Sequence, residues 1–283
     1  MSAVVVTYNR LSLLQECIDA LRKQTRVPDE IIVVDNGSTD GTHDWLSKQP
    51  DIFVVRQQNS GSSGGQATGV IESYRRNHDW FWLMDDDTIP QPDALKRMCD
   101  TPQFRDKSAG FLASIVVWTD GRCQPLSAPL TPAHTWISKT ATDHCIGAES
   151  STFVSVMVNR LAIARVGVPF RGFFLLWDDI EFTTRISRFM PGYFVFDSFA
   201  VHKTPDFDAP ALSNSPLKMR HHQRNRVLYL RMQPMSPRRR WWKILKLVVR
   251  DVGLLASRRI TFQDFTWTLR GIFMNCDIEF VTP

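Results

Sequence analysis

The sequence predicts an α/β protein built around a mainly parallel, doubly wound sheet flanked by helices. Short β-branched runs alternate with helix-spaced apolar patterns through the first hundred residues, and the connections between them are short. The chain has 283 residues, of which 43% are hydrophobic and 22% are charged, as is typical of globular proteins. This composition excludes disordered, collagen-like and coiled-coil classes. No apolar run approaches the ~18 residues of a membrane-spanning helix.

Four strands and three helices are expected in the first hundred residues. Strands buried on both faces of a parallel sheet read as continuous apolar, β-branched runs, and amphipathic helices carry apolar residues three and four apart. The turn at 36–38 follows the second strand, and Thr39 or Asp40 can cap the helix after it. The strands are expected at 3–8, 30–35, 52–55 and 80–84, and the helices at 11–24, after residue 40, and at 65–76.

The rest of the chain is mixed and then helical. A loop with two prolines is expected at 126–138, and a very apolar segment at 173–177 ends in acidic residues. Strands are expected at 111–117, 153–158 and 193–196, and helices at 161–166, 181–189, 221–231 and 238–250.

Charge is distributed unevenly along the chain. Residues 1–217 carry 20 Lys and Arg against 25 Asp and Glu, whereas residues 218–283 carry 14 against 4. A basic tail on an acidic body suggests an anionic partner, either a membrane surface or a polyanion. On a helical wheel the 238–250 segment separates two faces. The basic face holds Arg239, Lys243, Lys246 and Arg250, and the apolar face holds Trp241, Ile244, Leu245, Val248 and Val252.

Cysteine spacing and the N-terminus bear on the cellular compartment. The five cysteines are scattered and form no CxxC pair, so neither a disulfide framework nor a zinc site is indicated. The first eight residues lack a basic lead and a small-residue cleavage site, so no secretory signal is expected. The expected compartment is the cytoplasm.

Asp85, Asp86 and Asp87 follow the fourth strand, where ligands of doubly wound sheets bind. Adjacent carboxylates repel one another, and a cation would compensate that repulsion. Strand alternation would point Asp85 and Asp87 the same way, which suits Mg²⁺ or Mn²⁺ on a diphosphate. The alternative interpretation is a solvated acidic turn that caps the next helix.

A second acidic cluster, Asp178 and Asp179, follows Trp177. One of these carboxylates beside a sugar-binding Trp can act as a general base, and the alternative is capping of the helix that follows. The Gly/Ser stretch at 59–67 can bring backbone N–H groups close to a phosphate or sugar, although flexible linkers have the same composition. It matches neither GxGxxG nor a P-loop. A lone histidine such as His202 is usually structural.

Three motifs in order resemble a family 2 glycosyltransferase of the GT-A fold: VVTYNR at 5–10, IVVDNGSTDGT at 32–42 and LMDDD at 83–87. WDDIEF at 177–182, VH at 201–202 and HQRNR at 222–226 resemble its galactofuranosyltransferase-like and rhamnosyltransferase-like branch. The resemblance covers about the first 230 residues. It implies a GT-A catalytic domain at 1–217, with a nucleotide-binding half at 1–107 and an acceptor-binding half at 108–217, followed by a basic amphipathic helical tail at 218–283.

The resemblance also implies roles for individual residues. Asp35 would accept a hydrogen bond from the uracil or thymine ring, and Asp179 would be the catalytic base. A Mn²⁺ or Mg²⁺ ion would be held by Asp85, Asp87 and His202. The donor site would further include Thr7, Asn9, Arg10, Asn59, Gly65 and Asp86, and the acceptor site Trp177, Asp178, Arg224 and Asn225.

The expected function is inverting sugar transfer from UDP-galactofuranose to a bacterial surface polysaccharide or a lipid-linked glycan. The alternatives are a dTDP-rhamnose-dependent rhamnosyltransferase, another hexosyltransferase, or an inactive scaffold that binds nucleotide sugars. A nucleotidyltransferase would need a Gly-rich basic loop after the first strand, and the acidic body argues against a nucleic-acid partner. The tail is expected either to contact an anionic membrane at the inner face of the cytoplasmic membrane or to pack on the body, with Trp241 and Trp242 in the core.

Overall fold

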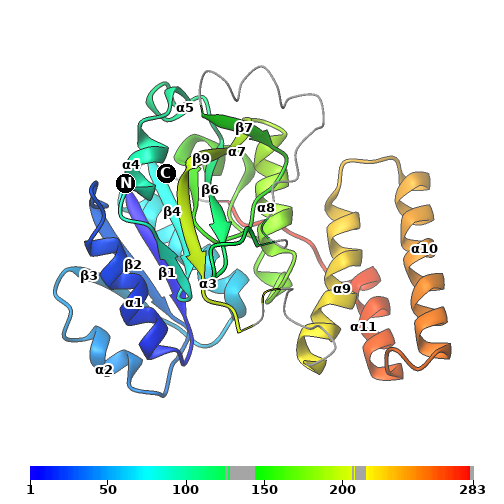
Figure 1. Ribbon diagram of the computed structural model, residues 1–283. Helices are drawn as coiled ribbons and strands as arrows, with labels where there is room; N and C mark the ends of the chain where they lie inside the picture. Colours follow the sequence, from blue (N-terminus) through cyan, green and yellow to red (C-terminus); the bar gives the residue numbers. More distant parts are fainter. Residues whose placement is uncertain (125–126, 128–143, 206, 208–214, 281–283) are drawn as a thin grey trace.

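The computed structural model describes residues 1–124, 127, 144–205, 207 and 215–280 (Figure 1). The expected loop at 126–138 therefore lies outside the described residues, apart from Ser127. The strands are β1 (Ser2–Thr7), β2 (Glu30–Asp35), β3 (Ile52–Arg56), β4 (Trp80–Asp85), β5 (Thr88–Pro90), β6 (Phe111–Val117), β7 (Cys145–Ala148), β8 (Val156–Asn159) and β9 (Gly192–His202). The helices are α1 (Leu11–Arg22), α2 (Thr42–Leu46), α3 (Gly61–Arg75), α4 (Ala94–Cys99), α5 (Pro102–Arg105), α7 (Arg160–Val166), α8 (Asp178–Ser187), α9 (Pro216–Met232), α10 (Pro237–Ala256) and α11 (Phe262–Phe273).

The strands form one mixed sheet in the order β3-β2-β1-β4-β8-β6-β9-β5, with β7 paired to β9. The first four strands in that order are parallel, and β8 then runs antiparallel to β4. The register pairs Thr7 with Asp35 and Val6 with Asp85, so the carboxyl ends of β1, β2 and β4 meet at one edge. The α/β fold class expected from the sequence is confirmed.

Two apolar layers cover the faces of this sheet. Ala3 and Val5 of β1 belong to the layer that includes α1 and α4, whereas Val4 belongs to the layer that includes α3, α7 and α8. Because successive strand residues point to opposite faces, a central strand needs apolar residues at every position. This explains why the first strand reads as an uninterrupted apolar run.

The Gly/Ser stretch is the first turn of α3, which begins at Gly61 and not at residue 65 as the sequence suggested. A Cβ atom on Gly65 would lie 2.4 Å from Cγ1 of Val6, and one on Gly69 would lie 2.2 Å from Cγ1 of Val4. The small residues therefore let α3 pack closely on β1. Gly65 is buried in this contact, and its expected role as a donor-binding residue stays a prediction.

Several other boundaries differ from the expectations. The strand expected at 153–158 is β8, the one expected at 193–196 extends to His202, and the helix expected at 181–189 begins at Asp178. The elements β5, β7, α4, α5 and α11 were not anticipated. With three and four residues, β5 and β7 are too short to carry a periodic signal, and their pairing with β9 is a tertiary contact.

The helices α9, α10 and α11 form a unit at the right of Figure 1. Inside it, Asp251 of α10 accepts hydrogen bonds from Arg226 of α9 and Thr268 of α11, each at 2.7 Å. A small apolar cluster of Phe170, Phe173 and Leu228 joins α9 to the body. Among the described helices, none is both long and apolar enough to span a bilayer.

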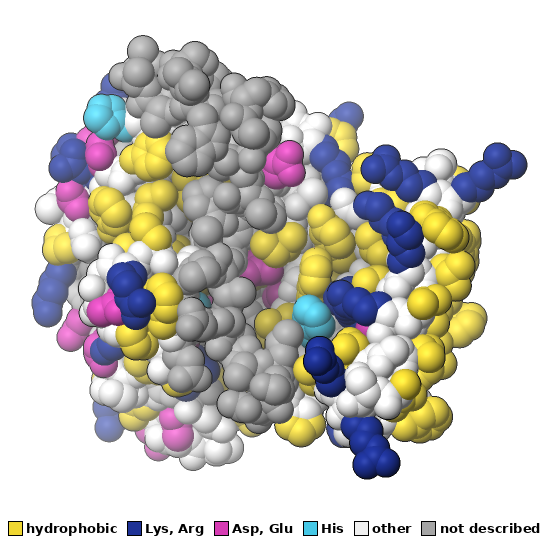
Figure 2. All heavy atoms as spheres, turned by 45° about the vertical axis from the view of Figure 1, so that its right-hand side comes forward, with side chains coloured by type: hydrophobic (Ala, Val, Ile, Leu, Met, Phe, Trp, Pro, Cys, Tyr) yellow, Lys and Arg dark blue, Asp and Glu magenta, His cyan; other side chains and the backbone are white. Residues whose placement is uncertain are grey.

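The exposure of the tryptophans on α10 contradicts one of the two expected alternatives for the tail. Ile244 and Asp251 are buried on its packed side, but Trp241 and Trp242 are 56% and 58% exposed. The alternative that puts both tryptophans in the core is therefore wrong. Figure 2 shows hydrophobic and basic side chains together on the surface of this helical unit.

Candidate functional site

A hollow of about 250 Å³ lies at the carboxyl ends of β1 and β4, beside the start of α3. Its position follows from the parallel strands, whose carboxyl ends open the crevice where doubly wound sheets bind ligands. It brings together residues from five separate stretches of the chain. Its lining includes Thr7, Arg10, Asn59, Asp85, Asp86 and Leu175.

Asp86 is held on the β1 side of this hollow. Its carboxylate accepts a hydrogen bond from Oγ1 of Thr7 at 2.8 Å and one from Nη1 of Arg10 at 3.2 Å. The same Arg10 nitrogen donates to Oδ2 of Asp87 at 2.8 Å. Arg10 thus neutralises part of the charge of the acidic run, and about half of its side chain stays exposed. The half-exposed guanidinium can still donate hydrogen bonds to an anionic ligand.

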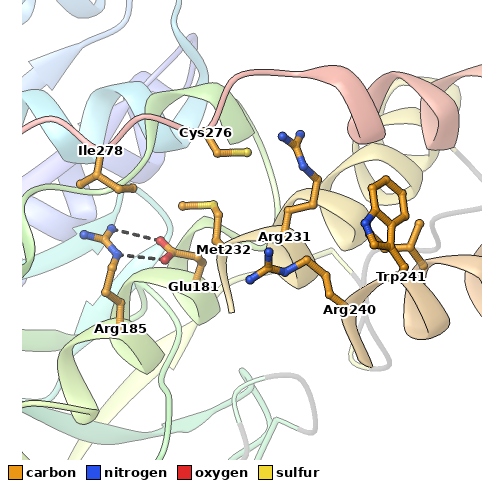
Figure 3. Close-up of a pocket in the computed structure, with 9 residues that line it drawn as sticks. Glu181, Arg185, Arg231, Met232, Arg240, Trp241, Cys276 and Ile278 are labelled. Carbon is orange, nitrogen blue, oxygen red and sulfur yellow. Dashed lines mark hydrogen bonds and ion pairs between the residues drawn. The ribbon is translucent and has the colours of Figure 1, made fainter. Parts of the chain in front are cut away.

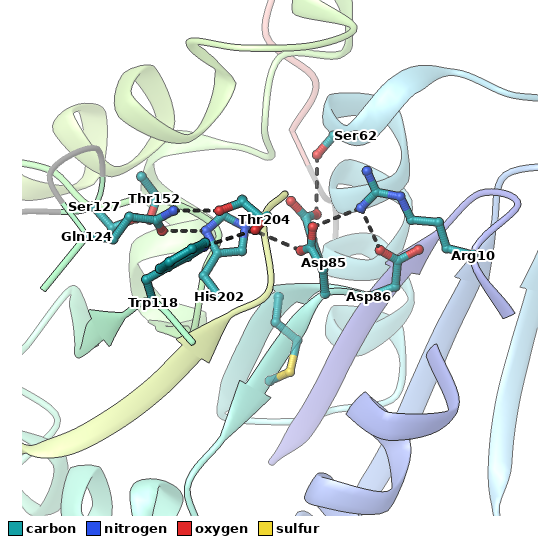
Figure 4. Close-up of polar contacts among 12 residues, drawn as sticks. Arg10, Ser62, Asp85, Asp86, Trp118, Gln124, Ser127, Thr152, His202 and Thr204 are labelled. Carbon is teal, nitrogen blue, oxygen red and sulfur yellow. Dashed lines mark hydrogen bonds and ion pairs between the residues drawn. The ribbon is translucent and has the colours of Figure 1, made fainter. Parts of the chain in front are cut away.

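His202 lies beside Asp87 because β5 and β9 are antiparallel neighbours and pair Thr88 with His202. Nε2 of His202 is 3.3 Å from Oδ1 of Asp87, and Nδ1 is 2.6 Å from Oε1 of Gln124 (Figure 4). Gln124 in turn donates to Oγ1 of Thr204 at 2.9 Å. The histidine ring therefore has a defined orientation, with one nitrogen directed at the acidic run.

Asp85 has different partners from Asp87. Its Oδ1 lies 3.2 Å from Nε2 of Gln66 and 3.4 Å from Oγ of Ser62, both on α3. The strand β4 ends at Asp85, so strand alternation does not extend to Asp87 as the sequence argument assumed. Within the described part of the chain, no three His, Cys, Asp or Glu side chains converge as the ligands of a bound metal do.

The electrostatics of the acidic run nevertheless fit a cation. Burial, with the charges of Asp87 and Asp86, raises the pKa of Asp85 to about 7. Burial also raises the pKa of Asp86 to about 6, although Arg10 opposes it. Oδ1 of Asp87 is buried and accepts no hydrogen bond from a described residue. The available ligand atoms are carboxylate oxygens and one imidazole nitrogen, and a positive ion between them would relieve the repulsion of the carboxylates. Such a set of ligands suits Mn²⁺ or Mg²⁺.

Asp35 ends β2 and is fully buried. Its Oδ1 accepts the backbone N–H of Ser38 at 2.8 Å. Its Oδ2 accepts no hydrogen bond from the described residues, and Nε of Arg56 lies 3.7 Å from it. A buried acceptor without a donor is costly, so this oxygen is suited to an N–H group of a ligand.

Asn9 and Asn59 use their side chains to hold turns. Oδ1 of Asn9 accepts the N–H of Thr39 at 2.7 Å, and Oδ1 of Asn59 accepts the N–H of Gly61 at 2.9 Å. Asn9 has a φ of 53°, a left-handed conformation that asparagine tolerates better than most residues. Both side chains are exposed, and of the two only Asn59 lines the hollow.

The second acidic cluster begins α8. Asp178 is 4% exposed, its Oδ2 has no described hydrogen-bond partner, and burial with the charges of Asp179 and Asp85 raises its pKa well above the ordinary value. Asp179 is partly exposed, and burial raises its pKa to about 6 against the opposing N–H groups of Ile180 and Phe153. At neutral pH Asp179 is therefore ionised, whereas burial favours the neutral form of Asp178.

Trp177 precedes this cluster in a left-handed conformation with a φ of 71°. Its Nε1 donates to Nδ1 of His222 at 3.2 Å, and its ring lies 5.3 Å from that of Tyr229. The tail helix α9 therefore contributes directly to the surroundings of Asp178 and Asp179.

Arg224 and Asn225 have a setting that differs from the expected contact with a ligand. Asn225 is fully buried, and its Nδ2 lies within 2.9 Å of the carbonyl oxygens of Phe173, Leu175 and Leu176. Nη2 of Arg224 donates to the carbonyls of Gly172 and Phe173 at 2.7 Å. These donors are occupied by backbone oxygens, and their assignment as acceptor-binding residues stays a prediction.

Sequence reasoning missed Gln66 and Gln124, which contact Asp85 and His202. Gln66 could have been found, because it stands in the first half of the helix that opens at the Gly/Ser stretch. No local pattern singles out Gln124, whose contact with His202 is set by the pairing of β6 and β9.

A second hollow, of about 340 Å³, lies between α8 and the helical tail unit (Figure 3). The Glu181–Arg185 ion pair, with Nε to Oε1 at 2.9 Å, lines one side, and Arg231, Arg240 and Trp241 line the other. None of the candidate site residues lines this hollow. Its size alone does not make it the reaction centre. The buried oxygen atoms that lack a hydrogen-bond donor, and the carboxyl groups with raised pKa values, lie outside it.

Comparisons with known proteins bear on the family and the fold. Residues 2–121 match the model of glycosyl transferase family 2. Galactofuranosyltransferase GlfT1 is 27% identical over 197 residues in Mycolicibacterium smegmatis and 30% identical over 196 residues in Mycobacterium tuberculosis. Each match covers 66% of this chain but only 65% and 64% of the relative's own length.

Among solved structures, GalNAc-T7 with UDP, GalNAc and Mn²⁺ superposes with a TM-score of 0.63 at 16% identity. The superposition covers 81% of this chain and 48% of that chain. At this identity the likeness establishes the shared fold.

Proposed function

We propose that this chain, which carries a family 2 glycosyltransferase domain of the GT-A fold, transfers a sugar with inversion from a nucleoside diphosphate to a glycan acceptor. The observation that carries the proposal is the hollow at the carboxyl ends of β1 and β4, with its acidic run and Arg10. In this proposal residues 1–107 bind the donor, residues 108–217 contribute the acceptor side, and the tail from residue 218 supports it.

The donor is UDP-galactofuranose in this proposal, because the similar curated relatives are galactofuranosyltransferases. The free oxygen of Asp35 accepts the ring N–H of uracil, which compensates its lack of a partner. Thr7 and Arg10 keep Asp86 beside the ribose, and Asn9 and Asn59 hold the turns around the nucleotide. Thymine offers the same ring N–H, so dTDP-rhamnose, like another hexose donor, is an outcome that the experiment distinguishes.

A divalent cation, Mn²⁺ or Mg²⁺, would be held by Asp85, Asp87 and His202. It would supply the positive charge that stabilises the departing diphosphate. The chain itself contributes Arg10, whose guanidinium remains half exposed beside Asp86 and Asp87. The hydrogen bond to Gln124 keeps Nε2 of His202 directed at the acidic run.

Asp179 is the general base in this proposal. With a pKa of about 6 it is ionised at neutral pH and can take the proton of an acceptor hydroxyl. The hydroxyl oxygen attacks the anomeric carbon, and the bond to the diphosphate oxygen breaks on the opposite face. A single in-line displacement inverts that carbon. Asp178, which is buried and whose pKa burial raises well above the ordinary value, shapes the acceptor side together with Trp177.

The acceptor is a bacterial surface polysaccharide or a lipid-linked glycan in this proposal, and the protein works at the inner face of the cytoplasmic membrane. The support is the exposed face of α10, where Trp241, Trp242, Leu245, Val249 and Val252 are between 48% and 63% exposed. Exposed Arg239, Lys246 and Arg250 lie on the same helix. Interfacial tryptophans and basic side chains together are typical of a surface that contacts anionic lipid.

A donor panel tests the proposal. Hydrolysis and thermal shift are measured with Mn²⁺ and UDP-galactofuranose, UDP-galactopyranose, UDP-glucose or dTDP-rhamnose, each with and without EDTA. We expect hydrolysis and stabilisation with UDP-galactofuranose that EDTA abolishes. A response to another donor would revise the sugar. Binding without hydrolysis or transfer would favour an inactive scaffold, and no response to any donor would contradict the assigned site.

A further inference from the structure

The 172–177 segment, which leads into α8, has an unusual backbone. Phe174, Leu176 and Trp177 have φ values of 63°, 68° and 71°, in the left-handed region that residues other than glycine rarely adopt. Three such residues within four positions are maintained only when surrounding contacts compensate for the strain, and strain of this kind concentrates at functional sites.

This segment joins the two halves of the candidate site. Phe174 and Leu175 line the donor hollow, and Asp178 and Asp179 follow Trp177 directly. On the donor side, the carbonyl of Phe174 accepts the N–H of Ser63 at 3.3 Å. A displacement of the segment would therefore move the donor wall and the base together.

Two adjacent residues of α9 hold the segment from the other side. Nδ2 of Asn225 lies 2.9, 2.7 and 2.9 Å from the carbonyl oxygens of Phe173, Leu175 and Leu176. Nη2 of Arg224 lies 2.7 Å from the carbonyls of Gly172 and Phe173. Carbonyls in a strained turn have no regular partner in secondary structure, so these bonds satisfy groups that would otherwise be unpaired.

Arg224 also orients the amide of Asn225. Its Nε donates to Oδ1 of Asn225 at 2.8 Å, which leaves Nδ2 as the atom directed at the carbonyls. The guanidinium is itself held over the ring of Trp267 of α11, 5.4 Å from the ring centroid. Asn225, Arg224 and α11 thus form one chain of contacts from the tail unit to the segment before Asp178.

We propose that Arg224 and Asn225 are positioning residues that hold the 172–177 segment in the conformation in which Asp179 meets the acceptor hydroxyl. This inference rests on the proposed function, since it assumes that Asp179 is the base. It gives the tail unit a part in the reaction centre that is separate from any contact with a membrane.

The test compares N225D with a matched control, N159D. Both substitutions replace a buried amide nitrogen that donates to backbone carbonyls with an oxygen of the same size. Asn159 is 1% exposed and its Nδ2 bonds to the carbonyls of Lys107 and Ala109 at 3.1 and 3.0 Å. It pairs with Trp80 at the start of β4, the opposite end of that strand from Asp85.

Three quantities are measured in each full-length variant: amide hydrogen exchange of peptides that span 172–180, the Kd of UDP with Mn²⁺, and kcat and KM of sugar transfer. In N225D we expect exchange in 172–180 to be at least about tenfold faster. We expect kcat to fall by about 10²-fold while the Kd of UDP changes much less. N159D is expected to show neither change in this segment.

Unchanged exchange at 172–180 in N225D would overturn the holding role, and faster exchange with unchanged kcat would overturn the positioning role. If N225D does not fold, R224K replaces it, because lysine keeps the charge but loses the Nε that orients Asn225. If the wild-type chain transfers no sugar, the proposed function has failed, and the exchange measurement still decides whether Asn225 holds the segment.

Discussion

Nε2 of His202, at the end of β9, lies 3.3 Å from Oδ1 of Asp87, two residues after the end of β4. Burial alone would raise the pKa of Asp87, but His202 and Arg10 together lower it below its ordinary value. The carboxylate is therefore ionised and prepared to bind a cation. The antiparallel pairing of β5 with β9 creates this contact.

Replacement of His202 tests the predicted metal site. We expect H202A to raise the Mn²⁺ concentration for half-maximal donor hydrolysis by about tenfold or more, because it removes one of three proposed ligands. A Mn²⁺ titration of hydrolysis gives this value. H144A is the control, since His144 is an exposed histidine whose ion pair with Asp197 involves none of the candidate site residues. An equal Mn²⁺ requirement in H202A and wild type would contradict the ligand assignment.

Asp179 and Asp178 offer an isosteric comparison for the base. D179N is expected to lower kcat of transfer by about 10²- to 10⁴-fold with little change in UDP affinity, because the amide cannot accept the proton. D178N is expected to cost less, because Asp178 is buried and burial favours its neutral form, which an amide resembles. Single-turnover transfer and UDP titration separate the two effects. A larger loss in D178N would move the base assignment to Asp178.

The pH dependence of transfer follows from the raised pKa of Asp179. Since the base acts only when ionised, kcat is expected to fall as the pH decreases through about 6, the folded-state pKa of Asp179. Measurement of kcat from pH 5 to 8 at saturating donor and Mn²⁺ checks this. The residual activity of D179N should lack this acidic limb, and a limb that persists unchanged would assign the titration to another group.

Asp35 is expected to determine affinity for the nucleotide. D35N replaces the free acceptor Oδ2 with an amide nitrogen, while the remaining oxygen can still accept the Ser38 N–H. Loss of a buried hydrogen bond to a charged acceptor costs about 1.5–3 kcal/mol, so UDP should bind at least about tenfold more weakly. Calorimetric titration with UDP and Mn²⁺ measures the loss. An unchanged Kd would remove Asp35 from the base-binding site.

The exposed face of α10 can be tested with vesicles. The double variant W241S/W242S is expected to lose sedimentation with vesicles of anionic phospholipid, because interfacial tryptophans and basic residues contribute jointly. F189S is a matched control, since Phe189 is a 55% exposed aromatic residue on the body. Equal sedimentation of the wild type with anionic and neutral vesicles would contradict an electrostatic contribution. Equal loss in both variants would contradict a specific role for α10.

Much of the first half of the fold was predictable because its signals are local. The strands β1, β2 and β4 are buried on both faces, so their apolar runs are uninterrupted, and α1 has a strong helical period. The position of Asp35 and Asp85 at one sheet edge also follows from parallel strands. The Gly/Ser stretch does not reveal the true start of α3, because small residues that permit close packing on Val6 have the same composition as a flexible loop.

The sequence by itself determined the α/β class, the edge of the sheet at which the carboxylates gather, and the resemblance that names the chemistry. These depend on local pattern and on the order of elements along the chain. Only the tertiary structure decided that Asn225 and Arg224 hold the 172–177 segment and that Trp241 and Trp242 stay exposed. It also distinguished Asp178, which is buried, from Asp179, which is partly exposed and ionised at neutral pH. The burial of a side chain and its hydrogen-bond partners depend on distant parts of the chain. A local sequence pattern therefore does not predict which of two adjacent carboxylates becomes buried.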